Sequence, residues 1–473
     1  MDAMVVQARK ESAGSPFRGQ RVHFIGVGGT GMGGLARMMI DAGAAVSGSE
    51  PKPNAQTAEL SRLGAKISLQ QGGELLDSGV NLVVRSAAVG DDNREFAAAR
   101  GLGIRTVKYA QMLGMVMSHR LGVAVAGTHG KSTTTAMISF ALLECRADPS
   151  FVVGGMVPQL GGSSRSGRGE VFVAEACEFD RSFHNLHPKI AVITNIEEDH
   201  LDCYKNIEEI VGSFAAFARL VPEDGMVIAG GDDARVSEAV EGIAAPVQRA
   251  ALATMPGDLD WSTRIVGIAD GCYRGEIFHE KQMVGELQLS VAGRHNLINA
   301  TLATAACAAC GLEPGEAIAA LNRFTGVDRR MTLVGRHHGA IIVDDYGHHP
   351  TEIRATLKAL RERYSPRRLI CVFQPHQHSR TRFLLEEFAA SFELADETIV
   401  PDIYFVRDSE AERQRVSSID LVQRLLVRGQ TAIYLSEFSA IVEYLDKVAG
   451  AGDVIVTMGA GNVWEIGRQL NSG

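Results

Sequence analysis

Short apolar runs alternate with amphipathic stretches along the chain, and many of the apolar runs end in a polar or glycine-containing loop. Such runs are typical of buried parallel strands, whereas apolar positions that recur every three to four residues are typical of helices. The strands that this pattern predicts lie at 22–27, 45–48, 81–85, 104–107, 121–125, 170–174, 189–194, 340–343, 369–373, 397–401 and 453–457. The predicted helices lie at 35–42, 134–143, 296–310 and 314–324. The alternation of the two predicts an α/β protein with mainly parallel sheets.

Length and composition indicate a globular protein with several domains. The chain has 473 residues, 45% of them hydrophobic, and at roughly 150 residues per domain this predicts about three domains. A net charge of −9 without a run of Lys or Arg gives no electrostatic basis for binding nucleic acid or an anionic membrane. No apolar stretch approaches the roughly 20 residues of a membrane span, and residues 1–20 lack the apolar core of a signal peptide. We therefore expect a cytoplasmic protein.

The cysteines agree with a reducing compartment. There are seven, an odd and scattered set that does not suit a disulfide framework. Cys307 and Cys310 have the spacing of a redox or zinc pair, but they lie in a predicted helix with no second pair nearby. We interpret them as buried helical thiols.

A phosphate-binding loop follows the predicted strand at 121–125 and leads into the predicted helix at 134–143. Residues 126–133 read Ala-Gly-Thr-His-Gly-Lys-Ser-Thr, although Val125 stands where the strict pattern has its first glycine. In such a loop, backbone N–H groups and the helix dipole bind phosphate, the lysine reaches the outer phosphates and the hydroxyl ligates Mg²⁺. We predict an ATP or GTP site formed by Gly127, Thr128, His129, Gly130, Lys131, Ser132 and Thr133. The alternative is a glycine-rich turn that happens to carry a lysine.

A second glycine-rich loop lies near the start of the chain. Residues 26–33 read Gly-Val-Gly-Gly-Thr-Gly-Met-Gly, follow a predicted strand and turn into the predicted helix at 35–42. Glu50 stands about where a dinucleotide-binding motif has its acidic ribose ligand. Taken alone, this βαβ opening indicates an NAD(P) enzyme.

Polar residues follow two further strands of the middle segment. Glu175 comes directly after the strand at 170–174, and an acidic run ending in His200 follows the strand at 189–194. Ligands bind beyond the carboxyl ends of parallel strands, so we predict that Ser132, Glu175 and His200 converge on a nucleotide-bound Mg²⁺. The alternatives are a capping or salt-bridging role for Glu175 and a surface position for His200.

The third segment repeats this arrangement. Its first strand runs into residues 344–352, which read Asp-Asp-Tyr-Gly-His-His-Pro-Thr-Glu, and its second runs into residues 374–382, rich in anion-binding side chains. Arg329 and Arg330 lie at the junction between the middle and third segments. Either arginine is a candidate for a γ-phosphate contact, and either has pairing with an acid across the domain junction as its alternative.

In this order, the motifs resemble those of the Mur ligase family. The resemblance rests on 26–33, 127–131, Thr194-Asn195 with Asp199-His200, the His-Asn-Leu-Ile-Asn run at 295–299, and 344–352. These motifs cover nearly the whole chain, and 345–352 is most similar to members that add alanine. The resemblance implies three α/β domains: a Rossmann-like UDP-binding domain at 1–117, a central P-loop ATPase-type domain at 118–327 and a C-terminal Rossmann-like, amino-acid-binding domain at 328–473.

The resemblance also implies an activity, namely an ADP-forming ligase of peptidoglycan precursor synthesis that uses ATP and Mg²⁺. The expected substrates are UDP-N-acetylmuramate and L-alanine. The sugar carboxylate would attack the γ-phosphate, and the amino group of alanine would open the resulting acyl phosphate. This chemistry requires electrostatic clamping rather than covalent catalysis by the protein. No NAD, nucleic acid or membrane is expected to bind, and the protein is expected to be a monomer or a weak homo-oligomer.

Roles for individual residues follow from the same resemblance. The UDP-sugar is expected at Gly26, Gly28, Gly29, Thr30, Gly31, Met32, Ser49 and Ser86. Adenine is expected near His295, Asn296 and Asn299, and the ribose near Asp345. Lys131 would hold the β- and γ-phosphates with Arg329 or Arg330, and the metal ligands would be Ser132, Glu175 and His200. Tyr346, His348 and Arg380 would face the amino acid. Because alanine arrives as an ammonium ion, we hypothesise that His348 accepts its proton.

Several positions depart from the family pattern. Ser132 replaces the usual threonine and keeps the hydroxyl, whereas Cys177 and Phe179 interrupt an otherwise acidic loop. Gln377 and His378 replace an arginine and a tyrosine, which leaves Arg380, with Arg382 as a second candidate, to meet the amino-acid carboxylate.

Two kinds of rival interpretation stay open. One is a recycling ligase that attaches a whole tripeptide to the same sugar nucleotide. The other is a protein of a different class, either a non-catalytic nucleotide sensor or an NAD-linked dehydrogenase.

Overall fold

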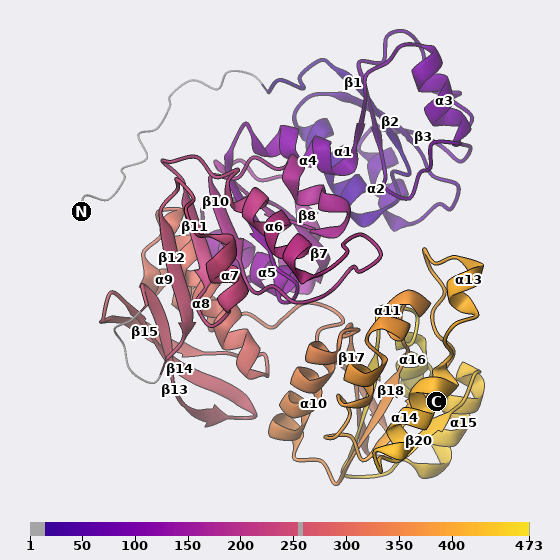
Figure 1. Cartoon of the computed structure of the whole chain (residues 1–473). Helices are drawn as coiled ribbons and strands as arrows, with labels where there is room; N and C mark the ends of the chain where they lie inside the picture. The colour runs from indigo at the N-terminus through magenta and orange to yellow at the C-terminus, as the bar shows by residue number, and fades with distance from the viewer. Residues whose placement is uncertain (1–14, 254–258, 473) are drawn as a thin grey trace.

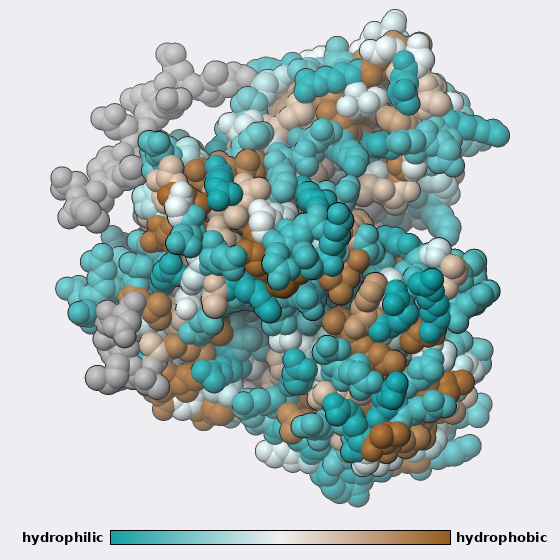
Figure 2. Space-filling model, in the orientation of Figure 1, coloured by the Kyte–Doolittle hydropathy of each residue, from teal (hydrophilic) through white to brown (hydrophobic). Residues whose placement is uncertain are grey.

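The computed structural model describes residues 15–253 and 259–472, and it confirms the predicted three-part α/β architecture (Figure 1). Three separate sheets of five, ten and six strands follow one another along the chain. Among the described residues, no helix is both long and apolar enough to cross a membrane. Figure 2 shows polar side chains over most of one face of the molecule, with apolar residues in scattered patches.

The first sheet is parallel throughout, in the order β3-β2-β1-β4-β5. Its strands are β1 (Arg21–Ile25), β2 (Ala45–Ser49), β3 (Lys66–Ser68), β4 (Leu82–Arg85) and β5 (Thr106–Lys108). Its helices are α1 (Thr30–Asp41), α2 (Ala55–Arg62), α3 (Arg94–Gly101) and α4 (Tyr109–Met117). Residues 22–25 of β1 are all buried, because apolar clusters pack on both faces of this sheet.

The middle sheet has the order β15-β14-β13-β12-β11-β10-β6-β9-β7-β8 and is parallel from β13 to β7. Its strands are β6 (Leu121–Ala126), β7 (Ser150–Val157), β8 (Gly162–Arg165), β9 (Val171–Glu175), β10 (Ile190–Ile193), β11 (Met226–Gly230), β12 (Val247–Leu252), β13 (Trp261–Ala269), β14 (Cys272–His279) and β15 (Gln282–Gln288). Its helices are α5 (Lys131–Glu144), α6 (Ile207–Ala218), α7 (Ala234–Ala239), α8 (Arg294–Ala309) and α9 (Pro314–Leu321), with 3₁₀ turns η1 (Pro158–Leu160) and η2 (Phe179–Asn185). The antiparallel extension β13 to β15 was not predicted from the sequence.

The third sheet has the order β16-β17-β21-β18-β19-β20, and its edge strand β16 is antiparallel to β17. Its strands are β16 (Thr332–His337), β17 (Ala340–Asp345), β18 (Arg368–Phe373), β19 (Glu397–Val400), β20 (Ala432–Tyr434) and β21 (Asp453–Met458). Its helices are α10 (Pro350–Tyr364), α11 (His378–Phe383), α12 (Leu385–Ala389), α13 (Glu410–Arg413), α14 (Ser418–Val427), α15 (Phe438–Val448) and α16 (Trp464–Ser472).

The hydrophobic cores distinguish the third sheet from the other two. One continuous cluster joins the first sheet to the middle one, from Phe24 to Phe214, so these two parts pack as neighbours with a shared interior. The third sheet has its own clusters on its two faces, around Phe373 and around Ile455. The prediction of buried helical thiols is confirmed for Cys307, which is fully buried in α8, but not for Cys310, which is half-buried and caps the end of that helix; both are free.

Candidate active site

The phosphate loop connects β6 to α5 and is held tightly by the segment that follows β10. Gly127 and Gly130 have φ angles of 139° and 84°, a backbone region that favours glycine. A Cβ atom on Gly127 would lie 1.9 Å from the Thr194 hydroxyl oxygen, so there is also no room for a side chain. The Thr194 hydroxyl donates to the His129 carbonyl at 2.6 Å, and the Asn195 amide oxygen accepts the His129 N–H at 2.8 Å. These contacts hold the loop in its bent conformation.

Lys131 begins α5, and its ammonium group makes three short contacts. It donates to the carbonyl oxygens of Gly127 and Thr128 at 2.6 and 3.1 Å, and to Glu178 at 2.9 Å. Burial alone would lower the pKa of Lys131, but the Glu178 carboxylate outweighs it, so the pKa is raised and the side chain is a fixed cation at the loop.

Glu175 ends β9, and His200 lies in the loop after β10; these two strands flank β6, and both residues line the same cavity as Ser132. Glu175 accepts the Gly154 N–H at 2.7 Å, while His200 has a φ of 53° and packs against the ring of Phe179. The Nε2 atom of His200 lies 3.7 Å from Glu178. Two buried atoms here, Nδ1 of His200 and Oε2 of Glu178, have no hydrogen-bond partner among the described residues.

A smaller cavity of about 200 Å³ lies beside the phosphate loop. It brings together the four residues predicted for the nucleoside, His295, Asn296, Asn299 and Asp345, with His129, Gly130 and Thr133 of the loop. Burial lowers the pKa of His295 to about 4, so the ring is neutral near pH 7. Burial raises the pKa of Asp345 to about 6, and its two oxygens accept the N–H groups of Gly347 and Met331, each at 2.8 Å.

Both candidate arginines are paired with acids and with the ring of Tyr346. Arg329 donates to Asp344 at 3.0 Å, and Arg330 lies 3.4 Å from Glu352. Their guanidinium carbons lie 5.0 and 5.2 Å from the Tyr346 ring centroid, within the range of cation–π contact. Both side chains also line the cavity that contains Ser132 and Glu175. Each arginine therefore pairs with an acid and lies at the cavity wall at the same time.

Glu352 connects the third domain to the phosphate loop. Its carboxylate accepts a hydrogen bond from the backbone N–H of His348 at 2.9 Å and lies 3.4 Å from Nδ1 of His129. Burial alone would lower the pKa of His129, but Glu197 and Glu352 raise it to about 9. His349 caps α10 and bonds the Glu198 carbonyl at 3.0 Å, and the Thr351 hydroxyl donates to Glu197 at 2.6 Å.

The His348 ring lies in the cavity wall with Tyr346 and His376. Its Nδ1 atom lies 3.1 Å from the Tyr346 carbonyl oxygen. Burial lowers the pKa of His348 to about 4. The ring is therefore neutral near pH 7, the form that is able to accept a proton.

Arg380 projects from α11 into a buried ion pair with the middle domain. Its Nε and Nη2 atoms donate to one oxygen of Asp199 at 3.0 and 2.8 Å, and each residue is 7% exposed. Burial would raise the pKa of Asp199, but Arg380 holds it well below the usual range. Of the departures from the pattern, Gln377 and His378 are buried, whereas Cys177 lines the main cavity.

The glycine loop of the first domain leads from β1 into α1, with Gly26 at a φ of 80°. Glu50 accepts the Gly28 N–H at 3.1 Å, so its carboxylate closes the loop from one side. A Cβ atom on Gly31 would lie 2.6 Å from the Tyr109 hydroxyl, and burial with the charge of Glu175 raises the pKa of Tyr109. The glycine loop thus packs closely against Tyr109, the first residue of α4.

The other residues predicted for the UDP-sugar differ in exposure. Gly29 and Thr30 are exposed, Gly28, Gly31 and Ser86 are half-buried, and Met32 is buried. Ser49 is fully buried and donates to Glu95, which also contacts His23. In this structure the Ser49 hydroxyl therefore serves an internal network.

The main cavity has a volume of about 890 Å³ and lies between the middle and third domains. It is lined by Lys131, Ser132, Glu175, His200, Arg329, Arg330, Tyr346, His348 and Arg380, together with residues that sequence reasoning gave no role, among them Glu352, His376 and Arg407. Motifs from two domains thus meet at one place.

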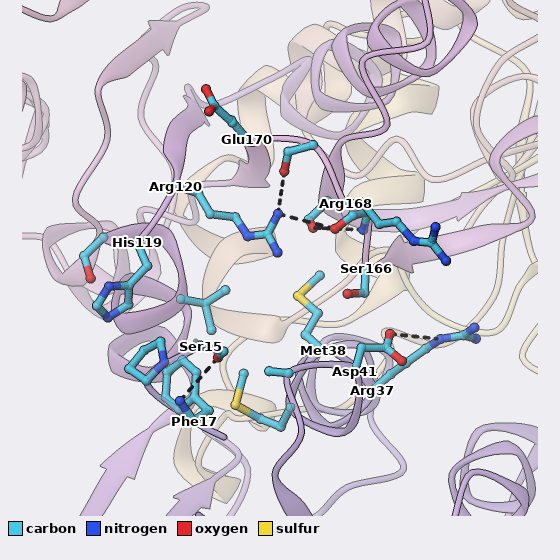
Figure 3. Close-up of a pocket in the computed structure, with 18 of the residues that line it drawn as sticks. Ser15, Phe17, Arg37, Met38, Asp41, His119, Arg120, Ser166, Arg168 and Glu170 are labelled. Carbon is cyan, nitrogen blue, oxygen red and sulfur yellow. Dashed lines mark hydrogen bonds and ion pairs between the residues drawn. The ribbon is translucent and has the colours of Figure 1, made fainter. Parts of the chain in front are cut away.

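A second cavity of about 1440 Å³ lies at the other side of the first two domains and contains none of the predicted site residues (Figure 3). Its Arg120 donates to the carbonyls of Gly167 and Gly169, and its Arg37 pairs with Asp41 and Glu59. These cations are thus already engaged within the protein.

Glu178 and Asp199 are two more residues of this site that sequence reasoning left without a role. Glu178 pairs with the phosphate-loop lysine and faces His200, and Asp199 pairs with Arg380. Both lie in loops that the sequence analysis considered, Glu178 three residues after the end of β9 and Asp199 six residues after the end of β10. Their sequence signal was a carboxylate in a loop at the carboxyl end of a parallel strand, which did not indicate its partner.

Models of known families match three consecutive segments of the chain. The matches are the Mur ligase family, catalytic domain, at residues 21–121, the Mur ligase middle domain at 125–307, and the Mur ligase, glutamate ligase domain, at 329–461.

Relatives match over almost their full length. The UDP-N-acetylmuramate–L-alanine ligase of Caldanaerobacter subterraneus subsp. tengcongensis is 40% identical over 95% of this chain and 97% of its own length. The ligase of the same name from Pelotomaculum thermopropionicum is 42% identical over 95% of this chain and 97% of its own length. Among solved structures, UDP-N-acetylmuramate–alanine ligase from Thermotoga maritima superposes with a TM-score of 0.77 at 25% identity, over 95% of this chain and 98% of that one. A murein peptide ligase from Psychrobacter arcticus superposes with a TM-score of 0.70 at 26% identity, over 96% of this chain and 98% of that one.

Proposed function

The chain belongs to the Mur ligase family, and we propose that it joins L-alanine to the carboxylate of UDP-N-acetylmuramate, with hydrolysis of ATP to ADP and phosphate. The observation that carries this proposal is the identity of about 40% to ligases of that name over 95% of the chain. The main cavity supports it, since it joins a phosphate loop to a cluster of arginine, tyrosine and histidine side chains from another domain. The reaction is a step of peptidoglycan precursor synthesis.

We assign ATP to the phosphate loop and the adjoining small cavity. Its phosphates would accept hydrogen bonds from the loop at 127–133 and face Lys131, and its nucleoside would lie among His295, Asn296, Asn299 and Asp345. The UDP group would bind at the glycine loop of the first domain. We take the first domain as residues 1–117, the middle domain as 118–327 and the third domain as 328–473.

The residues around Ser132 fit a magnesium ion. Mg²⁺ prefers oxygen ligands, and this region offers the Ser132 hydroxyl, the Glu175 carboxylate and the unpartnered Oε2 of Glu178. The unpartnered Nδ1 of His200 is a further possible ligand atom. Ser132, Glu175 and His200 would hold the ion, with Glu178 as an additional candidate. When bound, magnesium neutralises charge on the phosphate oxygens.

The protein's own groups supply positioning and charge. Attack of the sugar carboxylate on the γ-phosphate brings negative groups together, so the cations Lys131, Arg329 and Arg330 stabilise the transition state at the cavity wall. The acyl phosphate that results is then attacked by the amino group of alanine. The neutral His348 ring takes the proton that this amine must lose, and Tyr346 and Arg380 line the wall where the amino acid would lie.

Phosphate release with different acceptors tests the proposed function. The purified protein with ATP, Mg²⁺ and UDP-N-acetylmuramate is expected to release phosphate fastest with L-alanine, compared with glycine, L-serine and a tripeptide. The amide product is identified by its mass. Release with the tripeptide alone would assign the protein to recycling, an alternative favoured by the likeness to the Psychrobacter arcticus murein peptide ligase. No release with any acceptor would contradict the ligase assignment and favour a nucleotide sensor.

Replacing His348 by glutamine is expected to lower the turnover number by about 10²-fold, since general base catalysis typically contributes at least this factor. Affinity for ATP should not change. In the wild type, the rate of the chemical step should fall as pH drops through about 4, because protonation removes the base. Single-turnover rates against pH measure this, with His187→Gln, an exposed histidine, as the control. An unchanged rate and pH profile in His348→Gln would remove His348 from the mechanism.

A further inference from the structure

Two histidines and an aspartate meet on the third domain, outside the active site. His337 ends β16, His338 lies in the two-residue turn that leads to β17, and Asp446 lies on α15. The Nε2 atoms of His337 and His338 lie 3.0 and 2.9 Å from the same oxygen of Asp446. Three donor atoms therefore converge on one point, all within 4.8 Å of one another.

The backbone of the turn is what brings the two rings together. Consecutive side chains of an extended strand point to opposite faces, so neighbouring histidines would normally diverge. Here His338 and Gly339 have φ angles of 48° and 84°, which reverse the chain at this point. The ring centroids of His337 and His338 are consequently 4.1 Å apart. The left-handed conformation is unfavourable for a residue with a Cβ atom, so the geometry is maintained against a local cost.

The position of Asp446 favours a cation. It lies in the last turn of α15, where the helix dipole already places partial negative charge. Hydrogen bonds from His338 and then His337 hold the pKa of Asp446 below its usual value, so the group is an anion at neutral pH. The carboxylate and the helix end both attract positive charge.

We propose that His337, His338 and Asp446 form a binding site for a divalent transition metal ion of the zinc type, which ties the β16–β17 turn to α15. Two imidazole nitrogens and one carboxylate oxygen suit zinc, whereas magnesium prefers oxygen ligands. Zinc bonds of about 2.0–2.1 Å separate the ligands of a tetrahedral site by roughly 3.3 Å. The observed nitrogen–oxygen distances of 2.9 and 3.0 Å are within a few tenths of an ångström of this value.

Each ring binds the ion through the lone pair of Nε2, with its remaining proton on Nδ1, and bonds to the metal replace the two contacts with the Asp446 oxygen. His338 is 55% and Asp446 is 56% exposed at the side chain, so the ion has access from solvent and a water molecule completes its coordination.

A second group of possible ligands lies in the active site and has to be separated experimentally. His129, Glu197 and His349 also place their donor atoms within 4.8 Å of one another. These side chains contact one another and Glu352 across the domain interface. The experiment must therefore identify which cluster binds the ion.

The test is a titration of the untagged full-length protein, freed of metal with EDTA, with zinc chloride in a calorimeter. Asp446→Asn and His338→Gln are expected each to weaken one binding event at least tenfold, and His187→Gln, an exposed histidine elsewhere, is expected to leave it unchanged. Phosphate release should be unaffected in all three variants, which shows that they are folded. In zinc-soaked crystals, an anomalous-scattering peak is expected beside His337, His338 and Asp446. Equal zinc binding by the wild type and both cluster variants, or a peak only beside His129, would overturn the proposal.

Discussion

Replacing Lys131 by methionine is expected to slow ATP-dependent phosphate release by about 10²- to 10³-fold, the usual effect of removing one group that stabilises transition-state charge. Lys131 begins α5 and is the charged group at the centre of the phosphate loop, with its ammonium bonded to Gly127, Thr128 and Glu178. Methionine keeps the length of the aliphatic chain and removes the charge. Steady-state and single-turnover rates with saturating UDP-N-acetylmuramate and L-alanine measure the effect.

Two comparison variants separate catalysis from folding. Lys131→Met leaves Glu178, which is 3% exposed, without its cation, and an unpaired buried charge destabilises the protein. The double variant Lys131→Met with Glu178→Gln removes that charge, so it should recover thermal stability but not activity. Lys189→Met breaks a largely exposed ion pair with Asp224 and should change neither the thermal stability nor the activity. If the folded Lys131→Met protein kept more than a tenth of the wild-type rate, the assignment of Lys131 to the phosphates would be wrong.

The sequence predicted those parallel strands that are buried on both faces and read as continuous apolar runs, but it missed five other parallel strands, β3, β7, β11, β12 and β20. The run predicted at 121–125 is β6 and the run at 453–457 is β21, each within one residue. The antiparallel extension β13 to β15 lies at the edge of its sheet and was missed. There Ile265, Val266 and Ile268 are 37–50% exposed, so the apolar residues do not alternate with the buried face.

The site was predicted at the level of loops, but not at the level of partners. Glycine-rich turns and strand ends carry local signals, and so Lys131, Glu175 and His348 could be named from sequence and lie in one cavity. The contacts that hold the cavity together are not local. Glu178 is 47 residues from Lys131, and Asp199 is 181 residues from Arg380. A carboxylate in a loop has no local pattern that identifies a cation so far along the chain.

Arg380 is the residue for which sequence and structure suggest different roles, and replacing it by methionine is expected to destabilise the protein strongly. The resemblance directs Arg380 to the carboxylate of the amino acid, but its guanidinium is bonded to Asp199 across the interface of the middle and third domains. Removing one partner of a buried ion pair typically costs about 3–5 kcal/mol, because the other charge stays buried. Calorimetric unfolding is expected to begin at a clearly lower temperature in Arg380→Met.

Unfolding measurements on variants of Asp199 and Arg382 distinguish a role of Arg380 in holding the domains together from a role in binding the amino acid. If Arg380 acts mainly as a joint between domains, Asp199→Asn should reproduce the loss of stability, and the double variant should recover part of it, since no unpaired charge is left. Arg382→Met, on the same helix, breaks a more exposed pair with Glu412 and should change stability by less than about 1 kcal/mol. A large rise in the KM for L-alanine in Arg380→Met, with unfolding unchanged, would instead assign the guanidinium to the substrate. If Arg380 mainly holds the two domains together, the pair with Asp199 acts beside the contacts of His349 with Glu198 and of Thr351 with Glu197 to keep the His348 wall of the cavity at the phosphate loop. Both single variants should then lose part of their activity together.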